Sequence, residues 1–295
     1  MDDLQSIFVV ALAAATVRST APLLFAAMGG LLSERSGVMN IGLEGFMLFG
    51  AFAAAAGSYF TGNAWIGLLV ALVVGAVSGW VYAVWAISLR ADQIVAGTAI
   101  DLLGVGLPAF LVQRIWNQAG GSPTVNGLPD FGGISILAPV AFLLVPAVWW
   151  ILKRTKAGLR VMAAGESPTA AESVGIDVPR YRYACVVAAG ALAGLGGAYL
   201  SIGDLSQFTT NMTAGRGFIA LAAVIFGNWT PFGALGATLL FGFAQALRYQ
   251  VQALGWPIPQ ELIVSLPYIM TLVAITGLVG RSTPPAGLGR HATAD

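Results

Sequence analysis

Apolar residues run along this chain in long stretches that only short polar segments interrupt. Most stretches are roughly 17–25 residues long, which is the length of helix needed to cross a bilayer. They are continuous rather than alternating, and this excludes the pattern of a transmembrane β-barrel. The pattern predicts membrane helices at 4–31, 38–60, 64–89, 93–116, 135–152, 182–203, 215–228, 231–250 and 260–280.

One of these segments, 215–228, is too short to span the bilayer in the usual way. It is bracketed by Gly215, Gly217 and Gly227, which favour breaks and close packing. We therefore predict a half-helix here, and about eight to ten spans in all. The fold class is an all-α, polytopic transmembrane helical bundle with broken helices.

Composition agrees with a membrane protein. The chain is 57% hydrophobic and only 9% charged, with a mean hydropathy of +0.82, whereas soluble domains carry about 25% charged residues. The net charge of +1 gives no reason to expect a nucleic-acid partner. The single cysteine, Cys185, cannot form an intrachain disulfide, and we expect it to be a packing residue.

Basic residues orient the predicted spans. The polar segment 153–182 holds six of the 14 lysines and arginines, so the positive-inside rule places it in the cytoplasm. The loop 117–134 and the N-terminus then lie outside. We predict one transmembrane domain over 1–280, which includes this cytoplasmic loop, and a polar cytoplasmic tail over 281–295.

Catalytic chemistry is not expected from this chain. Its only histidine, His291, lies in the polar tail, so His-based triads and multi-His metal sites are excluded. Its only lysines are Lys153 and Lys156, and neither follows a phosphate-binding P-loop. We expect no cofactor and no metal, and ATP hydrolysis would require a separate subunit.

The motif ERSGVMNIGLEG, at 34–45, is the best candidate for a functional break in a membrane helix. Asn40 and Glu44 are four residues apart, so a helix would place them on one face. A carboxylate inside the membrane costs at least about 2.5 kcal/mol and needs a partner or a cavity. Glu44 either lines a pathway or binds free backbone N–H groups at the break, and Asn40 either lines the pathway or caps a helix.

A weak echo of this motif occurs at 213–221, where glycines again precede an apolar run. In the predicted topology the two segments run in opposite directions, which suggests an inverted repeat with a pathway between its halves. Gln207, Asn211 and Arg216 lie beside the second segment and could form a pathway wall. Asp101 has no partner nearby in the sequence, and a buried pair with Arg18 is one alternative.

The cytoplasmic loop contains a short, well-delimited helix. Ser167 and Pro168 favour a helix start, since Ser caps free N–H groups and Pro is tolerated at the first helical position. The helix should run over 169–174 and stop at Gly175. So short a helix is unstable alone, so it should pack on its own spans or in a partner's groove. A solvated loop with one capped turn is the alternative.

Three motifs, in the same order along the chain as in a known family, support a resemblance that covers residues 21–278. ERSGVMNIGLEG, GLRVMAAGESPTAAESVGI and GRGFIALAAVIFGNWTPFGA resemble permease subunits of bacterial ABC importers of the branched-chain amino acid, ribose and simple-sugar type. The NIGLEG form most resembles the second of two permeases in nucleoside importers. The resemblance implies a multi-pass protein of the bacterial cytoplasmic (inner) membrane that transports a small polar solute, with nucleosides favoured.

The resemblance also implies partners. These are a second homologous permease, a cytoplasmic ABC ATPase and an extracytoplasmic substrate-binding protein, often a lipoprotein, besides the membrane lipid. It further implies that 158–175 couples the chain to the ATPase. The coupling residues would be Gly158, Gly165, Glu166, Ala170, Ala171, Val174 and Gly175.

Two other functions stay open at this point. The chain could be an ion-coupled secondary carrier in which Glu44 and Asp101 relay protons, since inverted repeats suit carriers too. It could also be the same kind of ABC permease for a simple sugar. The basic, capped cytoplasmic loop favours a soluble motor over an ion gradient, whereas the sequence alone leaves the exact solute open.

Overall fold

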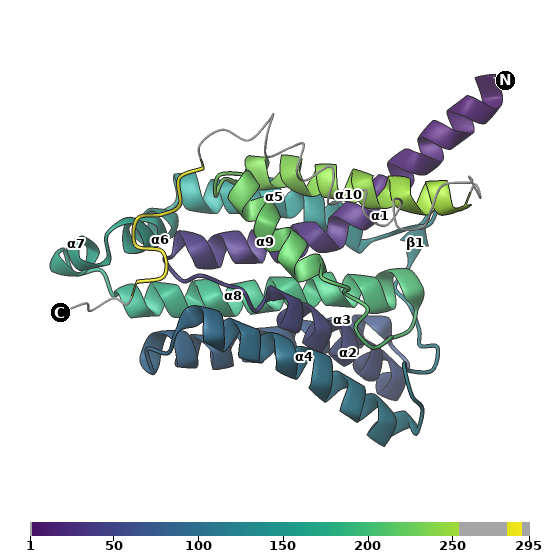
Figure 1. The fold of residues 1–295 in the computed structure, drawn as a ribbon, viewed down its shortest axis with the longest axis horizontal. Helices are drawn as coiled ribbons and strands as arrows, with labels where there is room; N and C mark the ends of the chain where they lie inside the picture. Colours follow the sequence, from purple (N-terminus) through teal and green to yellow (C-terminus); the bar gives the residue numbers. More distant parts are fainter. Residues whose placement is uncertain (1, 254–281, 291–295) are drawn as a thin grey trace.

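The computed structural model describes residues 2–253 and 282–290 as a bundle of helices with one small hairpin (Figure 1). Its helices are α1 (Asp2–Arg35), α2 (Leu43–Thr61), α3 (Ala64–Ala83), the π-helix η1 (Val84–Ser88), α4 (Gln93–Trp116), α5 (Leu137–Arg154), α6 (Lys156–Glu166), α7 (Pro168–Ser173), α8 (Val178–Ala198), the π-helix η2 (Tyr199–Leu205), α9 (Arg216–Phe226) and α10 (Pro231–Ala253). The antiparallel strands β1 (Asp130–Phe131) and β2 (Ile134–Ser135) form the hairpin.

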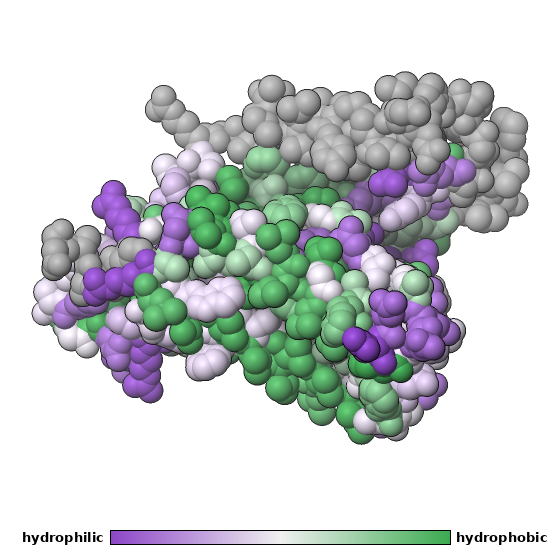
Figure 2. Space-filling model, turned by 60° about the horizontal axis from the view of Figure 1, so that its bottom comes forward, coloured by the Kyte–Doolittle hydropathy of each residue, from purple (hydrophilic) through white to green (hydrophobic). Residues whose placement is uncertain are grey.

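The predicted all-α membrane bundle is confirmed. Six helices in the described part of the chain are long and apolar enough to cross a membrane. Figure 2 shows apolar side chains gathered over the middle of the visible face, with polar side chains at its left and right ends. Helix α10 has 23 residues, which is also enough to span. The helix predicted at 260–280 lies outside the described residues.

Small residues let the central helix α8 lie close to its neighbours. A Cβ added to Gly194 would lie 2.8 Å from the carbonyl oxygen of Ala71, and one added to Gly79 would lie 2.8 Å from that of Val186. Such contacts leave no room for side chains and allow backbones to approach closely. Cys185, on the same helix, is buried as expected for a packing residue.

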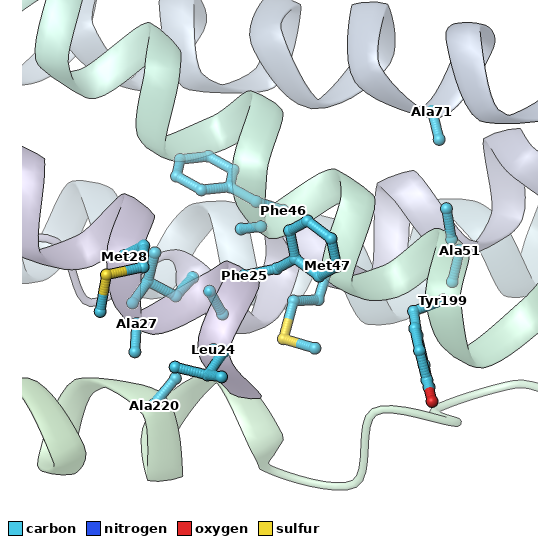
Figure 3. Packing of buried hydrophobic residues seen from close by; sticks show 14 of the residues in the cluster. Leu24, Phe25, Ala27, Met28, Phe46, Met47, Ala51, Ala71, Tyr199 and Ala220 are labelled. Carbon is cyan, nitrogen blue, oxygen red and sulfur yellow. The ribbon is translucent and has the colours of Figure 1, made fainter. Parts of the chain in front are cut away.

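The core lies where α1, α2 and α9 meet. Figure 3 shows Phe25 of α1 beside Met47 of α2, and Leu24 of α1 facing Ala220 of α9. All four side chains are fully buried. The short helix α9 is therefore packed inside the bundle.

Both predicted helix breaks are present. Helix α1 ends at Arg35 and α2 begins at Leu43, so the intervening motif is not helical. Helix α9 has 11 residues, or about 16 Å at 1.5 Å per residue, which is roughly half of the bilayer core. It begins after Gly215, whose φ of 83° is in the left-handed region. The inverted repeat stays a prediction.

The loop between α5 and α8 holds two helices, although the sequence pattern predicted one. Helix α7 matches the predicted segment, whereas α6 was not expected. The proposed capping by the Ser167 side chain is wrong, because it makes no capping hydrogen bond. Instead, its backbone joins the helices: its N–H donates to Ala163 of α6, and its carbonyl accepts from Ala171 of α7.

Candidate functional site

The start of the half-helix α9 is held by a carboxylate from another helix. Glu44 lies in the first turn of α2 and is only 4% exposed. It accepts hydrogen bonds from Thr213 Oγ1 (2.5 Å), from the Gly215 N–H (2.8 Å) and from the Gly217 N–H (2.6 Å). A Cβ on Gly217 would lie 2.5 Å from the Cα of Glu44, so this close approach requires glycine.

This arrangement stabilises α9 in two ways. The first N–H groups of a helix have no partners within it, and here Glu44 supplies them. Its negative charge also lies at the positive end of the helix dipole. Of the two alternatives for Glu44, the geometry matches the binding of free backbone N–H groups. Those groups belong to a segment about 170 positions away in the chain, which no local pattern could indicate.

The motif before α2 is fixed by helix α4. Gln93 Oε1 accepts from the Met39 N–H (2.8 Å), and Asp101 Oδ1 accepts from the Gly45 N–H (2.7 Å). Asp101 is therefore occupied at the start of α2, and the alternative of an ion pair between Asp101 and Arg18 is wrong.

Asn40, the other polar residue of the motif, is fully buried, and neither polar atom of its amide has a hydrogen-bond partner. The N-cap of α2 is Gly42, which lies two residues further on. The alternative in which Asn40 caps that helix is therefore wrong.

The other predicted pathway residues lie around the loop that leads into α9. The Arg216 guanidinium donates to the carbonyls of Met212 and Thr213 and, at 3.3 Å, to the Tyr249 hydroxyl. Gln207 is half-buried, and Asn211 is exposed with a left-handed φ of 58°. Arg216 and Glu44 thus meet at the same helix start, whereas Gln207 and Asn211 lie earlier in the loop.

The opposite end of α9 has contacts that the sequence analysis missed. Trp229, just after the helix, donates from Nε1 to Glu34 Oε2 at 2.5 Å, and Glu34 is 2% exposed. Arg35 Nε donates to the Trp229 carbonyl at 2.7 Å. Glu34 and Arg35 are the first two residues of the first motif, and Trp229 lies in the third. A charged pair inside a motif was therefore the only sequence signal for this contact.

Arg35 also contacts the segment between α5 and α8. Its Nη1 lies 3.6 Å from Glu166 Oε1 at the end of α6. An added Cβ on Gly165 would collide with the Arg35 carbonyl oxygen. Helix α6 therefore rests directly on the end of α1, and Arg35 touches both α6 and the segment after α9.

The tail segment 282–290 crosses this contact, as Figure 1 shows in yellow beside α6. Its backbone N–H groups donate from Gly287 to the Gly165 carbonyl (2.8 Å) and from Gly289 to the Gly37 carbonyl (3.0 Å). The Ala286 N–H donates to Glu166 Oε2 (3.2 Å). The predicted polar tail thus packs against the loop and the first helix break.

The predicted coupling residues divide into exposed and buried groups. The exposed group is Glu166, Ala170, Val174 and Gly175, and the buried group is Gly158, Gly165 and Ala171. Val174 is 75% exposed despite being apolar. The buried residues pack α6 and α7 onto the bundle, so only the first group can meet another protein.

The described residues contain no cluster of His, Cys, Asp and Glu that could hold a metal ion. What they contain is an apolar bundle with two helices that begin at one polar junction, and an exposed helix pair at one end. Helices that begin inside the membrane at a shared junction are typical of transport proteins. The fold and the site therefore define a membrane transport protein.

The chain belongs to the family described as "Branched-chain amino acid transport system / permease component", which matches residues 12–275. It is thus a transport subunit, a multi-pass permease of the bacterial inner membrane, and not an enzyme. The expected resemblance is confirmed.

Several relatives are similar over most of their length. The guanosine ABC transporter permease NupQ of Bacillus subtilis is 40% identical, covering 93% of this chain and 94% of its own. The nucleoside ABC transporter permease NupC of Lactococcus lactis is 34% identical, covering 91% and 92%. The putative glucose ABC transporter permease TsgC13 of Haloferax volcanii is 37% identical, covering 84% and 80%.

A second guanosine ABC transporter permease of Bacillus subtilis, NupP, is 24% identical over 88% of this chain and 80% of its own. No solved structure matches the chain.

Proposed function

We propose that this chain is one of two permeases in an ABC importer that carries nucleosides into the cell. The proposal is supported by NupQ and NupC, whose names give guanosine and nucleosides as substrates. NupQ and NupP are two guanosine permeases of one organism, which supports a second homologous permease as partner. The remaining partners are a cytoplasmic ABC ATPase and an extracytoplasmic substrate-binding lipoprotein.

A simple sugar is the second candidate substrate, and TsgC13 favours it by name. The ion-coupled carrier is the weaker alternative, because the family and these relatives are permeases of ABC systems.

The observation that carries the proposal is the surface of α7 and the residues after it. Ala170 and Val174 are exposed, although α7 itself is anchored through buried Ala171. An exposed apolar helix with a fixed rear face is suited to a groove on another protein. We assign this surface to the ATPase, with Glu166 and Gly175 at its edges.

A movement of that surface would be transmitted to the bundle through α6. Helix α6 ends at Glu166, which contacts Arg35, and Arg35 contacts the carbonyl of Trp229 after α9. A shift of α6 and α7 on nucleotide binding would therefore move the cytoplasmic end of α9. Rigid helices that shift against each other are a common way to switch access across a membrane.

The translocation pathway then lies beside α9. Glu44 holds the start of this helix, and Arg216 lies at the same point. Gln207 and Asn211 belong to the loop above it, and the unpaired amide of Asn40 belongs to the adjoining break. We assign these five residues to the pathway, with Glu44 as a positioning residue.

The test of coupling is Ala170→Arg in the complex with the second permease and the ATPase. A bulky cation on the docking surface should lower co-purification of the ATPase and reduce nucleoside uptake at least about tenfold, a loss of about 1.4 kcal/mol or more. Ala119→Arg, an exposed position in the loop after α4, is the matched control and should leave ATPase co-purification intact. Full ATPase binding and uptake by Ala170→Arg would refute the docking role.

A further inference from the structure

A cavity of about 310 Å³ opens at the end of the bundle away from α6 and α7. It lies between α1, η2 and α10 and is lined by Ala15, Arg18, Asp204, Tyr249 and Gln250. The volume is at the lower end of the roughly 300–1,000 Å³ typical of small-molecule sites. Nothing said so far of the coupling surface or of Glu44 accounts for these residues.

The cavity is lined by two side chains of opposite charge that do not form an ion pair. Arg18 and Asp204 both line it, yet no ion pair joins them. Arg18 belongs to the apolar segment Val9–Arg35, and an unpaired cation facing lipid there would be costly. This face of α1 is therefore turned toward water, a solute or a partner, and not toward hydrocarbon.

A buried hydroxyl on η2, the helix that also carries Asp204, lacks a partner as well. Tyr199 is 1% exposed, and its hydroxyl has no hydrogen bond. The phenol is close enough to Asp204 and Arg18 to interact with both electrostatically. In Figure 3 its hydroxyl end points away from Ala51. A buried polar atom is normally satisfied, and the described residues supply no partner for this hydroxyl.

The cavity adjoins the start of α9. Tyr249, in its wall, accepts a hydrogen bond from Arg216 at 3.3 Å. Arg216 is the first residue of the half-helix whose N–H groups Glu44 holds. A solute in the cavity would therefore lie next to Tyr249, whose hydroxyl is hydrogen-bonded to Arg216 at the junction that we assign to the pathway.

We infer that this cavity binds an uncharged nucleoside on its way to the junction, an inference that rests on the proposed function. The Asp204 carboxylate only accepts hydrogen bonds, and the Arg18 guanidinium only donates them. A base edge that presents N–H groups beside a carbonyl or ring nitrogen satisfies both. The exposed ring of Tyr249 offers a face on which a base can stack. One cation and one anion together favour a neutral solute over a nucleotide.

The experiment measures uptake of labelled guanosine by the complete importer in vesicles. Asp204→Asn and Arg18→Gln each remove one charged hydrogen-bond partner, and each should raise the KM for guanosine about tenfold. Tyr199→Phe removes only a hydroxyl and should raise the KM about threefold. Arg114→Gln is the matched control, because Arg114 lies over the Phe110 ring on α4, away from the cavity. Its KM should not change.

Co-purification of the ATPase and of the second permease with each variant separates a lost site from a lost complex. An unchanged KM in Asp204→Asn and Arg18→Gln would overturn the inference while leaving the proposed function standing. Loss of the second permease from these variants would also overturn it, since the charges would then face that subunit. If the unaltered importer carries no nucleoside, the proposed function itself fails. Equal competition by unlabelled glucose would overturn the assigned solute class.

Discussion

The two ends of the half-helix α9 are held in opposite ways. At its start, Glu44 is buried and binds two backbone N–H groups and a hydroxyl. At its other end, Arg35 donates to the carbonyl of Trp229 and lies 3.6 Å from Glu166. The Glu166 side chain is 55% exposed, so this last contact is in reach of water.

At the N-terminal end the anion Glu44 follows the helix dipole, and beyond the C-terminal end the cation Arg35 follows it beside the buried Glu34. The two ends differ in strength. Several hydrogen bonds to one buried charge are costly to break, because each lost acceptor leaves a buried donor. An exposed ion pair contributes about 0.2–1 kcal/mol. At the other end, Trp229 is also held by a buried hydrogen bond to Glu34, so the weak link there is the exposed pair between Arg35 and Glu166, which joins this end to α6.

The largest expected effect comes from Glu44→Ala. It leaves the N–H groups of Gly215 and Gly217 unsatisfied, at about 1–3 kcal/mol each. The free energy of unfolding should therefore fall by about 2–6 kcal/mol, as measured by denaturation in detergent, and uptake should disappear. Glu172→Gln, on the cytoplasmic helix α7, serves as the control. A melting temperature equal to that of the unaltered protein would show that the start of α9 is not anchored here.

A smaller effect is expected from Gly217→Ala. The new Cβ would meet the backbone of Glu44 and push α2 and α9 apart, and such overpacking costs about 1–3 kcal/mol. Gly236→Ala on α10 is the matched control, because a Cβ there meets nothing within 4 Å and helix propensity favours Ala by up to about 1 kcal/mol. Thermal unfolding of the two variants should therefore shift in opposite directions. Equal shifts would contradict the tight crossing.

The smallest effect on stability is expected from Glu166→Gln. Loss of an exposed ion pair should change the free energy of unfolding by less than about 1 kcal/mol, while uptake falls several-fold because the tie to Arg35 weakens. A double-mutant cycle with Arg35→Gln isolates this tie in the uptake rate. Fully additive losses in that cycle would mean that the two side chains act separately. The Arg35–Glu166 ion pair would then not be part of the proposed coupling route.

Local patterns predicted most of the helices. The stretch 93–116 is predicted with the same bounds as α4, because a continuous apolar run of the length that spans a bilayer is a local signal. The break before α2 was visible in its glycines. Helix α6 was missed because it carries Lys156 and Arg160 among small residues, and its stability depends on contacts with α5 and α8.

The candidate site was only half visible in the sequence. Glu44 was identified because a carboxylate in an apolar segment needs a partner. Its partners come from about 170 positions away in the chain, and no local pattern encodes such a contact. The same holds for Trp229 with Glu34, and for Arg18 with Asp204, which adjoin only through tertiary packing.

The short segment 282–290 has a practical meaning for anyone who expresses this protein. Gly287 and Gly289 attach it to the cytoplasmic loop and to the first break, and Arg182 donates to the carbonyl of Arg290. A reporter or affinity tag fused directly behind Arg290 would strain the contacts that join this segment to α6 and to the first break. Fusions for transport assays should therefore be placed elsewhere, or behind a long, flexible spacer.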